Sequence, residues 1–369
     1  MNLQETLPIL YQGKHCYNIE LQDSFDHLAD CLMDIQMQGR RLCIVSDSNV
    51  DALYGAQVQQ LLQNADFNTV CRFVFPAGEE NKTLDVITNL YEFLIQHEFD
   101  RSDVLIALGG GVTGDMTGYA AATYLRGIRF VQVPTSLLSM VDSSIGGKTG
   151  VDFRGYKNMV GAFYMPSLVY VNLSVLQTLD ERQRASGMGE IIKHSLIRDK
   201  NYFTWMTEHK EEICLLDTDA IARLVLCSQK IKKQVVENDP TEKGERAHLN
   251  FGHTIGHAIE KALHFSLLHG ECVGLGMVSA AYISVLRGNI TKDELFLIET
   301  LIASYGLPVR YNNLNNEEII DNCFHDKKKE GNSIRFVLLD SIGSCYTTTT
   351  VTVNEMNEAI NYLKGELRE

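Results

Sequence analysis

The chain has 369 residues, a length that predicts about two domains, and its 45% hydrophobic and 22% charged content is ordinary for a globular protein. A formal net charge of −14 argues against nucleic acid or a membrane as the partner, although lysines and arginines gathered in one place could still bind a small anion. No apolar run approaches the ~20 residues of a bilayer span, the first residues lack a signal-peptide pattern, and nine scattered cysteines without CxxC spacing indicate a cytoplasmic location.

The first half of the chain alternates short runs rich in β-branched residues with helical stretches. Strands are predicted at residues 41–47, 70–75, 103–108, 130–133 and 168–171, and a helix at residues 84–97. Apolar strands separated by helices are typical of a parallel sheet with helices on both faces. We therefore predict an α/β, Rossmann-like N-terminal domain with a mainly parallel sheet.

Helical periodicity dominates the second half. Long helices are predicted around residues 221–236 and 294–305, and a late strand at residues 335–339. We therefore divide the chain into an α/β domain at residues 1–178 and a mainly α-helical domain at residues 179–369. Small ligands usually bind in a cleft between two such domains, so we expect the active site there.

A glycine-rich turn, Gly109-Gly110-Gly111-Val112-Thr113-Gly114-Asp115, follows the third predicted strand and opens a helix. Its glycines would let the backbone approach a pyrophosphate, and the helix N-terminus would favour the negative charge. GxGxxG alone is weak evidence, since tight turns share it, but the strand-to-helix context strengthens a dinucleotide site. No acid follows about 20 residues later for the ribose, so Asp47 at the end of the first strand is the better candidate.

Cationic residues recur beside glycine-rich and metal-type stretches of this acidic chain. They are Lys148 at the end of the small polar segment 141–147, Lys157 next to Asn158, Lys193, Lys232, Arg246 and the lysine run 327–329. For any one of them a solvated surface position is the more common outcome, and Lys148 and Lys193 stand out because of their neighbours. Converging in a cleft, such cations would bind a phosphate or carboxylate through charge-assisted hydrogen bonds.

Two histidines four residues apart, His253 and His257, lie in the stretch 249–260. Positions i and i+4 share a helix face, so both imidazoles are predicted to point into the same space. A third histidine, His269, follows downstream. HxxxH by itself is more often a pair of buried helix histidines, because it lacks the glutamate of the protease HExxH motif. Together the three form a good candidate for a zinc site.

A carboxylate that could complete this site is Glu190, which shares a predicted helix face with Lys193 and His194 at i, i+3 and i+4. Four histidines are then candidates for at most three coordination positions on the metal. The spacing therefore leaves open whether His194 or His257 is a ligand.

The chain resembles the 3-dehydroquinate synthase family over nearly its whole length. The matching motifs are PAGEENK at residues 76–82, GGGVTGD at 109–115, AATYLRG at 121–127, PTS at 134–136, DSSIGGKTGVD at 142–152, KN at 157–158, GMGEIIKH at 187–194, LNFGHTIGHAIE at 249–260 and HGE at 269–271. So many motifs in the right order make the resemblance very specific. It implies that NAD and Zn²⁺ (or Co²⁺) are the cofactors and that the enzyme is a homodimer.

Residue roles follow from the resemblance, position by position. It implies Glu190, His253 and His269 as the metal ligands, and His257 as an acid–base residue instead of a ligand. The implied NAD site consists of Asp47, Glu79, Lys82, Gly110, Gly111, Val112, Gly114, Asp115, Thr135, Ser136 and Thr178, with Lys148 and Lys157 touching both ligands. The implied substrate-binding residues are Arg126, Asp142, Lys148, Lys157, Asn158, Lys193, Lys232, Arg246, Asn250 and Lys328. Of all these, His257, Lys193, Lys148, Asn158 and Arg126 are the implied catalytic residues.

The resemblance also implies a reaction. The family is a carbon–oxygen lyase of the shikimate pathway, which converts the anionic sugar-acid phosphate 3-deoxy-D-arabino-heptulosonate 7-phosphate (DAHP) into 3-dehydroquinate and phosphate. The steps are a transient oxidation by NAD⁺, β-elimination of phosphate, re-reduction, ring opening and an aldol closure. The alternative is a metal-dependent polyol or glycerol-phosphate dehydrogenase of the same two-domain plan. Those enzymes tend to have Asp in place of Glu190 and to lack the SSIGGK segment.

Overall fold

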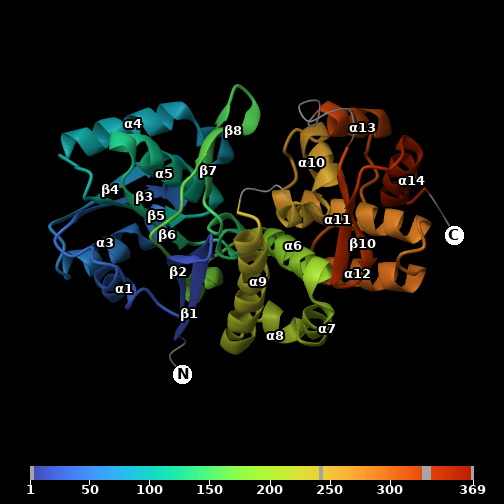
Figure 1. The fold of residues 1–369 in the computed structure, drawn as a ribbon, viewed down its shortest axis with the longest axis horizontal. Helices are drawn as coiled ribbons and strands as arrows, with labels where there is room; N and C mark the ends of the chain where they lie inside the picture. Colours follow the sequence, from blue (N-terminus) through green and yellow to red (C-terminus); the bar gives the residue numbers. More distant parts are fainter. Residues whose placement is uncertain (1–3, 241–243, 326–333, 367–369) are drawn as a thin grey trace. The chain divides into compact units, whose positions relative to one another are not determined.

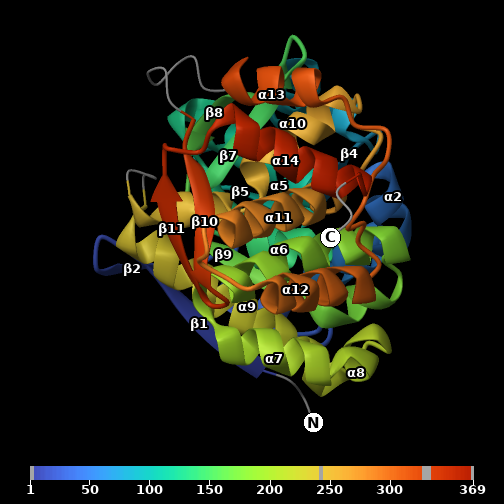
Figure 2. The same ribbon diagram turned by 90° about the vertical axis from the view of Figure 1, so that its right-hand side faces the viewer.

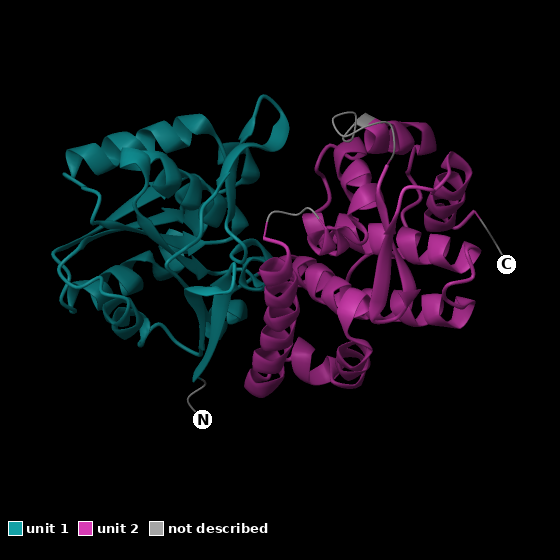
Figure 3. Cartoon of the chain, in the orientation of Figure 1, with its two compact units in different colours: residues 1–179 teal, residues 180–369 magenta. Residues whose placement is uncertain are grey.

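The computed structural model describes residues 4–240, 244–325 and 334–366. The chain divides into two compact units, Met1–Leu179 and Asp180–Glu369 (Figure 3). Each unit has its own hydrophobic core and is described separately.

A seven-stranded sheet organises the first unit (Figure 1). Its strands are β1 (Gln4–Tyr11), β2 (Lys14–Gln22), β3 (Arg41–Asp47), β4 (Thr69–Phe75), β5 (Val104–Gly109), β6 (Arg129–Pro134) and β9 (Leu168–Asn172). They lie in the order β1-β2-β9-β6-β5-β3-β4, and every neighbouring pair is parallel except β1 with β2. The five predicted strands and the mainly parallel sheet are confirmed, whereas the edge hairpin β1–β2 was missed.

Helices cover both faces of this sheet (Figure 1). They are α1 (Leu28–Asp34) and α3 (Ala56–Gln63) on one face, and α4 (Leu84–Gln96) and α5 (Gly111–Thr123) on the other. Leu90 of α4 and Met116 of α5 share a buried core with Val45 and Leu105 of the sheet. All six residues of β5 are buried, which explains why its sequence is a continuous apolar run instead of an alternating one.

A second hairpin, β7 (Lys148–Phe153) with β8 (Tyr156–Phe163), packs against α5 (Figure 1). Gly118 of α5 makes the close approach possible, because a Cβ there would overlap the Thr149 side chain. No strand was predicted in the polar, glycine-rich segment that leads into β7. The structure instead forms a short π-helix at Ser139–Ser143 and then this hairpin, so Lys148 and Asn158 lie on paired strands.

The second unit is mainly helical, as predicted. Its helices are α6 (Glu181–Arg198), α7 (Lys200–Glu208), α8 (Lys210–Cys214), α9 (Thr218–Asn238), α10 (His253–Ala262), α11 (His269–Leu286), α12 (Lys292–Ser304), α13 (Asn316–His325) and α14 (Val353–Lys364). They include the helices predicted around residues 221–236 and 294–305. The predicted late strand is β10 (Phe336–Ser341), which pairs with β11 (Ser344–Thr348) in an antiparallel hairpin.

Helix α11 runs through the middle of this unit, packed against α6, α10, α12 and α14 (Figure 2). It is long and apolar enough to cross a membrane by composition, but 78% of it is buried inside the protein, as in a core helix. Two glycines allow the close packing. A Cβ at Gly270 would overlap the Ser186 carbonyl oxygen of α6, and one at Gly276 would overlap the carbonyl oxygen of Gly252, just before α10. These contacts bring α6, α10 and α11 together, and the three helices carry the histidines and Glu190.

A charged cap joins the ends of α11 and α14. Arg287 donates from Nε to Oε1 of Glu355 (2.7 Å) and from Nη2 to Oε2 (3.0 Å), while the Thr352 backbone N–H donates to Oε2 (2.7 Å). The hydrogen bonds from Arg287 lower the pKa of Glu355 from 4.5 to about 2, although partial burial opposes the shift. Because the folded-state pKa is depressed, this stabilisation is fully present above about pH 4.5 and is lost as the pH falls towards about 2.

Substitution Glu355→Gln should therefore destabilise the protein by roughly 1–2 kcal/mol near neutral pH, a range that allows for solvent screening of a partly exposed pair. The difference in free energy of unfolding from wild type should shrink as the pH falls below about 4.5. Denaturant unfolding across this pH range measures it. Glu358→Gln, on the same helix, is the matched control. If the difference in free energy of unfolding does not change with pH, the ionised Glu355 carboxylate is not the source of this stabilisation.

Candidate functional site

The glycine turn of the first unit forms an open helix N-terminus. Strand β5 ends at Gly109, and α5 begins at Gly111 with Gly110 as an N-cap that has no side-chain cap. The first N–H groups of α5 are therefore not covered by a capping side chain and favour an anion. The Thr135 backbone N–H donates to the Gly109 carbonyl (2.9 Å), which fixes the neighbouring loop after β6 beside this turn.

Asp47 lies at the same edge of the sheet. It is the last residue of β3, the neighbour of β5, and its Oδ1 accepts from the Asn49 and Val50 backbone N–H groups (3.0 and 3.1 Å). Its Oδ2 accepts from Thr113 Oγ1 in the first turn of α5 (3.4 Å). The Thr178 hydroxyl lies at this edge too, hydrogen-bonded to Tyr54 in the connection after β3. The carboxyl edge of a parallel sheet is the usual nucleotide site of such folds.

A buried ammonium group is found beside the start of α5. Lys82, 3% exposed, donates from Nζ to Oδ2 of Asp115 (2.6 Å), and Oε1 of Glu79 lies 4.0 Å from the same nitrogen. Burial alone lowers the pKa of Lys82, but Asp115 and Glu79 outweigh burial and raise it above its usual value. Lys82 therefore stays protonated and holds Glu79 and Asp115 near the glycine turn.

The structure brings together most, but not all, of the first unit's expected site residues. The residues at the carboxyl edge or on the loops beside it are Asp47, Glu79, Lys82, Gly110, Gly111, Val112, Gly114, Asp115, Thr135, Ser136, Asp142 and Thr178. Lys148, Lys157 and Asn158 are exposed on the β7–β8 hairpin. Arg126 is different, because it follows α5 and precedes β6 and so lies at the opposite, amino edge of the sheet. A strand of this length separates the edges by roughly 20 Å.

Three imidazoles gather in the second unit. Gly252 adopts a left-handed conformation (φ 78°), from which α10 begins at His253, and His257 follows one turn later. His269 is the first residue of α11. The ring centroids lie 5.0 to 5.6 Å apart, and one nitrogen of each ring lies within 4.8 Å of the others. The predicted shared face of His253 and His257 is confirmed.

Glu190 on α6 faces two of these rings. Its carboxylate is fully buried, and its Oε1 lies 3.4 Å from Nε2 of His253 and 3.4 Å from Nε2 of His269. Lys193 forms an ion pair with Oε2. Neither oxygen accepts a hydrogen bond of ordinary geometry from the described residues. A buried carboxylate turned towards two imidazole nitrogens is a fitting donor set for Zn²⁺.

Electrostatics favour the metal-binding forms of two of these groups. Burial alone would raise the pKa of Glu190, but Lys193, His253 and His269 outweigh it and hold that pKa well below its usual range. Burial and the Lys193 charge hold the pKa of His253 well below its usual value. Glu190 is therefore ionised and His253 neutral near pH 7, which are the forms that bind a cation.

Glu260 is a member of the site that the sequence reasoning missed. Its Oε2 lies 3.8 Å from Nδ1 of His269, the ring nitrogen that does not face Glu190. Burial lowers the pKa of His269, but the neighbouring carboxylates of Glu190 and Glu260 outweigh burial and raise it to about 9. A carboxylate behind a histidine commonly orients a metal ligand. The available signal was its spacing, since Glu260 follows His257 by three residues on α10.

Three cations of the second unit are buried, although a solvated surface position is the more common outcome for lysine and arginine. Lys193, Lys232 and Arg246 are 2%, 5% and 2% exposed. Arg246 and Asn250 lie in the 3-10 helix Glu245–Asn250, which packs against α6 and against α9, the helix of Lys232. Several cations held in one unit raise the local positive potential, so this group favours an anionic ligand. Lys328 lies outside the described residues.

His194 is oriented by a different partner. It is fully buried on α6, and its Nδ1 is hydrogen-bonded to Ser228 Oγ of α9 (2.7 Å).

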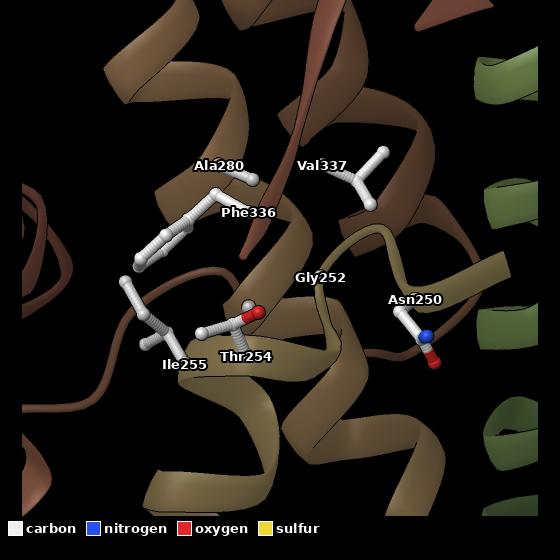
Figure 4. Close-up of a pocket in the computed structure, with 8 residues that line it drawn as sticks. Asn250, Gly252, Thr254, Ile255, Ala280, Phe336 and Val337 are labelled. Carbon is white, nitrogen blue, oxygen red and sulfur yellow. The ribbon is translucent and has the colours of Figure 1, made fainter. Parts of the chain in front are cut away.

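A small hollow of about 180 Å³ adjoins the start of α10 (Figure 4). It is lined by Asn250, Gly252, Thr254, Ile255, Gly276, Ala280, Phe336 and Val337. Its lining is mostly apolar, with Asn250 and Thr254 as the polar side chains among the lining residues. We interpret it as a packing defect beside the site.

Comparison with known families covers more than half of the chain. The family model described as 3-dehydroquinate synthase N-terminal matches residues 72–186, and the one described as 3-dehydroquinate synthase C-terminal matches residues 187–329. A 3-dehydroquinate synthase of Acetivibrio thermocellus is 42% identical over 322 residues, which cover 87% of this chain and 89% of the relative.

Solved structures with the same fold include two sugar cyclases. The 2-epi-5-epi-valiolone synthase of Streptomyces hygroscopicus subsp. jinggangensis, with NAD⁺ and Zn²⁺ bound, has a TM-score of 0.88 at 27% identity and covers 95% of this chain and 97% of that one. A 2-deoxy-scyllo-inosose synthase complexed with carbaglucose-6-phosphate, NAD⁺ and Co²⁺ has a TM-score of 0.87 at 25% identity, with 97% and 99% covered.

Proposed function

The chain belongs to the 3-dehydroquinate synthase family, and from this premise we propose that it converts DAHP into 3-dehydroquinate and phosphate. The observation that carries the proposal is the buried Glu190 carboxylate, which faces His253 and His269 and is paired with the buried ammonium of Lys193. A metal site directly beside a buried cation suits a substrate that offers hydroxyl groups to the one and an anion to the other.

We propose NAD and a divalent metal, Zn²⁺ or Co²⁺, as the cofactors. The exposed N–H groups at the start of α5 would hold the pyrophosphate, and Asp47 the ribose. Glu190, His253 and His269 would hold the metal. The two cofactors supply, when bound, reversible hydride transfer and polarisation of the hydroxyl that is oxidised.

The protein's own groups would bind the substrate anions and move protons. Lys193, Lys232, Arg246 and Asn250 in the second unit, and Asp142, Lys148, Lys157 and Asn158 in the first, are the proposed substrate contacts. Buried cations strengthen such contacts because water screens them little. His257 is exposed and lies 5.0 Å from His253 between ring centroids, so it can exchange protons with solvent beside the metal ligands. We therefore propose it as the acid–base residue.

The metal-dependent polyol or glycerol-phosphate dehydrogenase is the less favoured function. Both family models and the Acetivibrio relative are 3-dehydroquinate synthases. The buried ammonium of Lys193 beside Glu190 also suits an anionic substrate better than a neutral polyol. We further propose a cytoplasmic location.

The test is phosphate release from DAHP by the purified protein. Release should require both catalytic NAD⁺ and metal, so that chelation abolishes it and Zn²⁺ restores it, and no NADH should accumulate. The absence of phosphate release, with stoichiometric NADH formed from a polyol, would move the chain to the dehydrogenase function.

We propose that the enzyme is a homodimer, and the position of Arg126 supports this. Arg126 is an expected substrate contact, yet it lies at the edge of its own sheet opposite the glycine turn. Leu125 and Arg126 both have positive φ (50° and 68°), a strained conformation that often marks functional residues. A second copy of the chain could receive this arginine in its active site.

Complementation between inactive variants tests this arrangement. Arg126→Ala and His269→Ala should each be inactive. Refolding them as an equal mixture should restore roughly a quarter of wild-type activity, because about half of the dimers would be mixed and half of the sites in each mixed dimer would be intact. A mixture of Lys193→Met with His269→Ala is the control. Both residues lie in the second unit of the same chain, so no site of a mixed dimer would be intact and this mixture should stay inactive. A mixture of the first pair that stays inactive would contradict a shared site.

A further inference from the structure

A closed ring of three hydrogen bonds joins Lys82 to the β7–β8 hairpin. The Asp152 backbone N–H donates to the Lys82 carbonyl (2.8 Å), and the Asn158 backbone N–H donates to Oδ1 of Asp152 (2.8 Å). Lys82 Nζ completes the ring by donating to Oδ1 of Asn158 (2.5 Å). Within the ring each residue donates one hydrogen bond and accepts one. The loss of any member therefore removes a hydrogen bond from each of the other two.

The ring holds Asn158 in a conformation that few residues adopt. Its φ is +53°, in the left-handed region, which asparagine tolerates better than most side chains. Asn158 lies on the exposed part of the hairpin, where little packing could hold it. The acceptor on Asp152 and the buried ammonium of Lys82 therefore supply the order that the exposed strand lacks.

Lys82 also decides which way the Asn158 amide faces. An ammonium group only donates, so it must meet the amide oxygen, and the amide nitrogen then turns away from it. The Nδ2 hydrogens of Asn158 have no acceptor within the part of the chain that the structure describes. Asn158 accordingly turns its two Nδ2 donors away from Lys82 and leaves them available to a ligand.

We propose that Lys82 and Asp152 are positioning residues that hold Asn158 with its Nδ2 donors directed at an oxyanion of the substrate, a phosphate or carboxylate oxygen. This inference rests on the proposed function, because it takes Asn158 as a substrate contact. It adds a role for Lys82, which resemblance places only in the NAD site, and assigns one to Asp152, to which the resemblance gives none. The substrate atom at Asn158 must then be a hydrogen-bond acceptor.

Substitution Asn158→Asp tests the donor role. Aspartate keeps the shape and an acceptor for Lys82, but it replaces the Nδ2 donors with a negative charge. We expect kcat/KM for DAHP to fall by about a hundredfold or more, while the Kd for NAD⁺ changes by less than about threefold. Wild-type kcat/KM in this variant would overturn the donor role.

A matched pair at Asp152 tests the positioning role. Asp152→Asn keeps the Oδ1 acceptor and should retain activity within about threefold, whereas Asp152→Ala removes it and should lower kcat/KM for DAHP about tenfold. In the absence of substrate, hydrogen exchange of residues 148–163 should rise in Asp152→Ala and not in Asp152→Asn. Equal activity and equal exchange in the two variants would overturn the positioning role.

A double-mutant cycle separates the two roles of Lys82. At saturating NAD⁺, Lys82→Met should lower kcat/KM for DAHP in wild type but add less than about twofold in an Asn158→Ala background, because its effect passes through Asn158. If the losses of kcat/KM in the two single variants multiply in the double variant, Lys82 acts independently of Asn158. Failure of the proposed function is distinguishable, since the wild-type enzyme itself would then release no phosphate, while the exchange measurement would still decide whether the ring orders the hairpin.

Discussion

His269→Ala should lose its bound metal and lower phosphate release from DAHP by about a thousandfold or more. The ring supplies one of two nitrogens within 3.4 Å of the buried Glu190 oxygen, and a two-ligand site binds Zn²⁺ far more weakly than a three-ligand one. Polarisation by a metal is worth several kcal/mol of transition-state stabilisation, which corresponds to that factor. Metal content by atomic emission and the phosphate assay measure the two effects together.

The fold should survive this change. His269 retains 31% side-chain exposure, and it begins α11 without packing in its core. His264→Asn is the matched control, because His264 is an exposed histidine of the same unit with positive φ (51°), which asparagine tolerates. The control should keep its metal. Full metal content in His269→Ala would make the ligand assignment wrong, and His257 would then be the next candidate.

Lys193→Met should keep its bound metal but lose substrate binding, in contrast to His269→Ala, which should lose the metal. The ammonium group is 2% exposed and paired with Glu190, so a substrate anion that met it would be bound away from water. Truncation of one partner of such a buried charge pair costs about 2–5 kcal/mol, so we expect kcat/KM for DAHP to fall by about thirtyfold to several thousandfold.

Stability supplies an independent readout of the same substitution. Without metal, Lys193→Met leaves the fully buried Glu190 carboxylate without its strongest counter-charge, at a cost of about 3–5 kcal/mol. Zn²⁺ would neutralise the carboxylate, so the rise in Tm on adding Zn²⁺ should be larger in the variant than in wild type. A variant that loses both metal and Zn²⁺-dependent stabilisation would show that Lys193 supports the metal site itself.

Local sequence signals predicted the framework of both units well. The central strands β3, β5 and β6 are fully buried or nearly so, and their apolar runs have no other explanation. The β1–β2 hairpin was missed although β2 alternates buried Tyr17, Ile19 and Leu21 with polar residues, a strand signal that the sequence offered; β1 is mostly exposed and has no such regular pattern. The β7–β8 hairpin was missed because it rests on Gly118 of α5, a contact between segments about thirty residues apart.

Candidate site residues divide in the same way. The i, i+4 spacing predicted that His253 and His257 share a face, and the structure confirms it, but spacing could not identify Glu260 behind His269. Lysine and arginine are usually surface residues, so the sequence did not predict that Lys193, Lys232 and Arg246 are buried. Only the tertiary structure shows this. The hydrogen bonds from Lys82 to Asn158 and from Asn158 to Asp152 have no sequence pattern at all.

The sequence by itself determined the fold class and the family, and it predicted which residues carry chemistry, because strand and helix periods and short motifs are local properties of the chain. The tertiary structure decided which of those residues meet. Glu190 reaches His253 and His269 because glycines let α6, α10 and α11 approach closely, and Arg126 is set apart because a whole strand separates the two edges of the sheet. Such distances arise from packing between segments far apart in the chain, which no local pattern records.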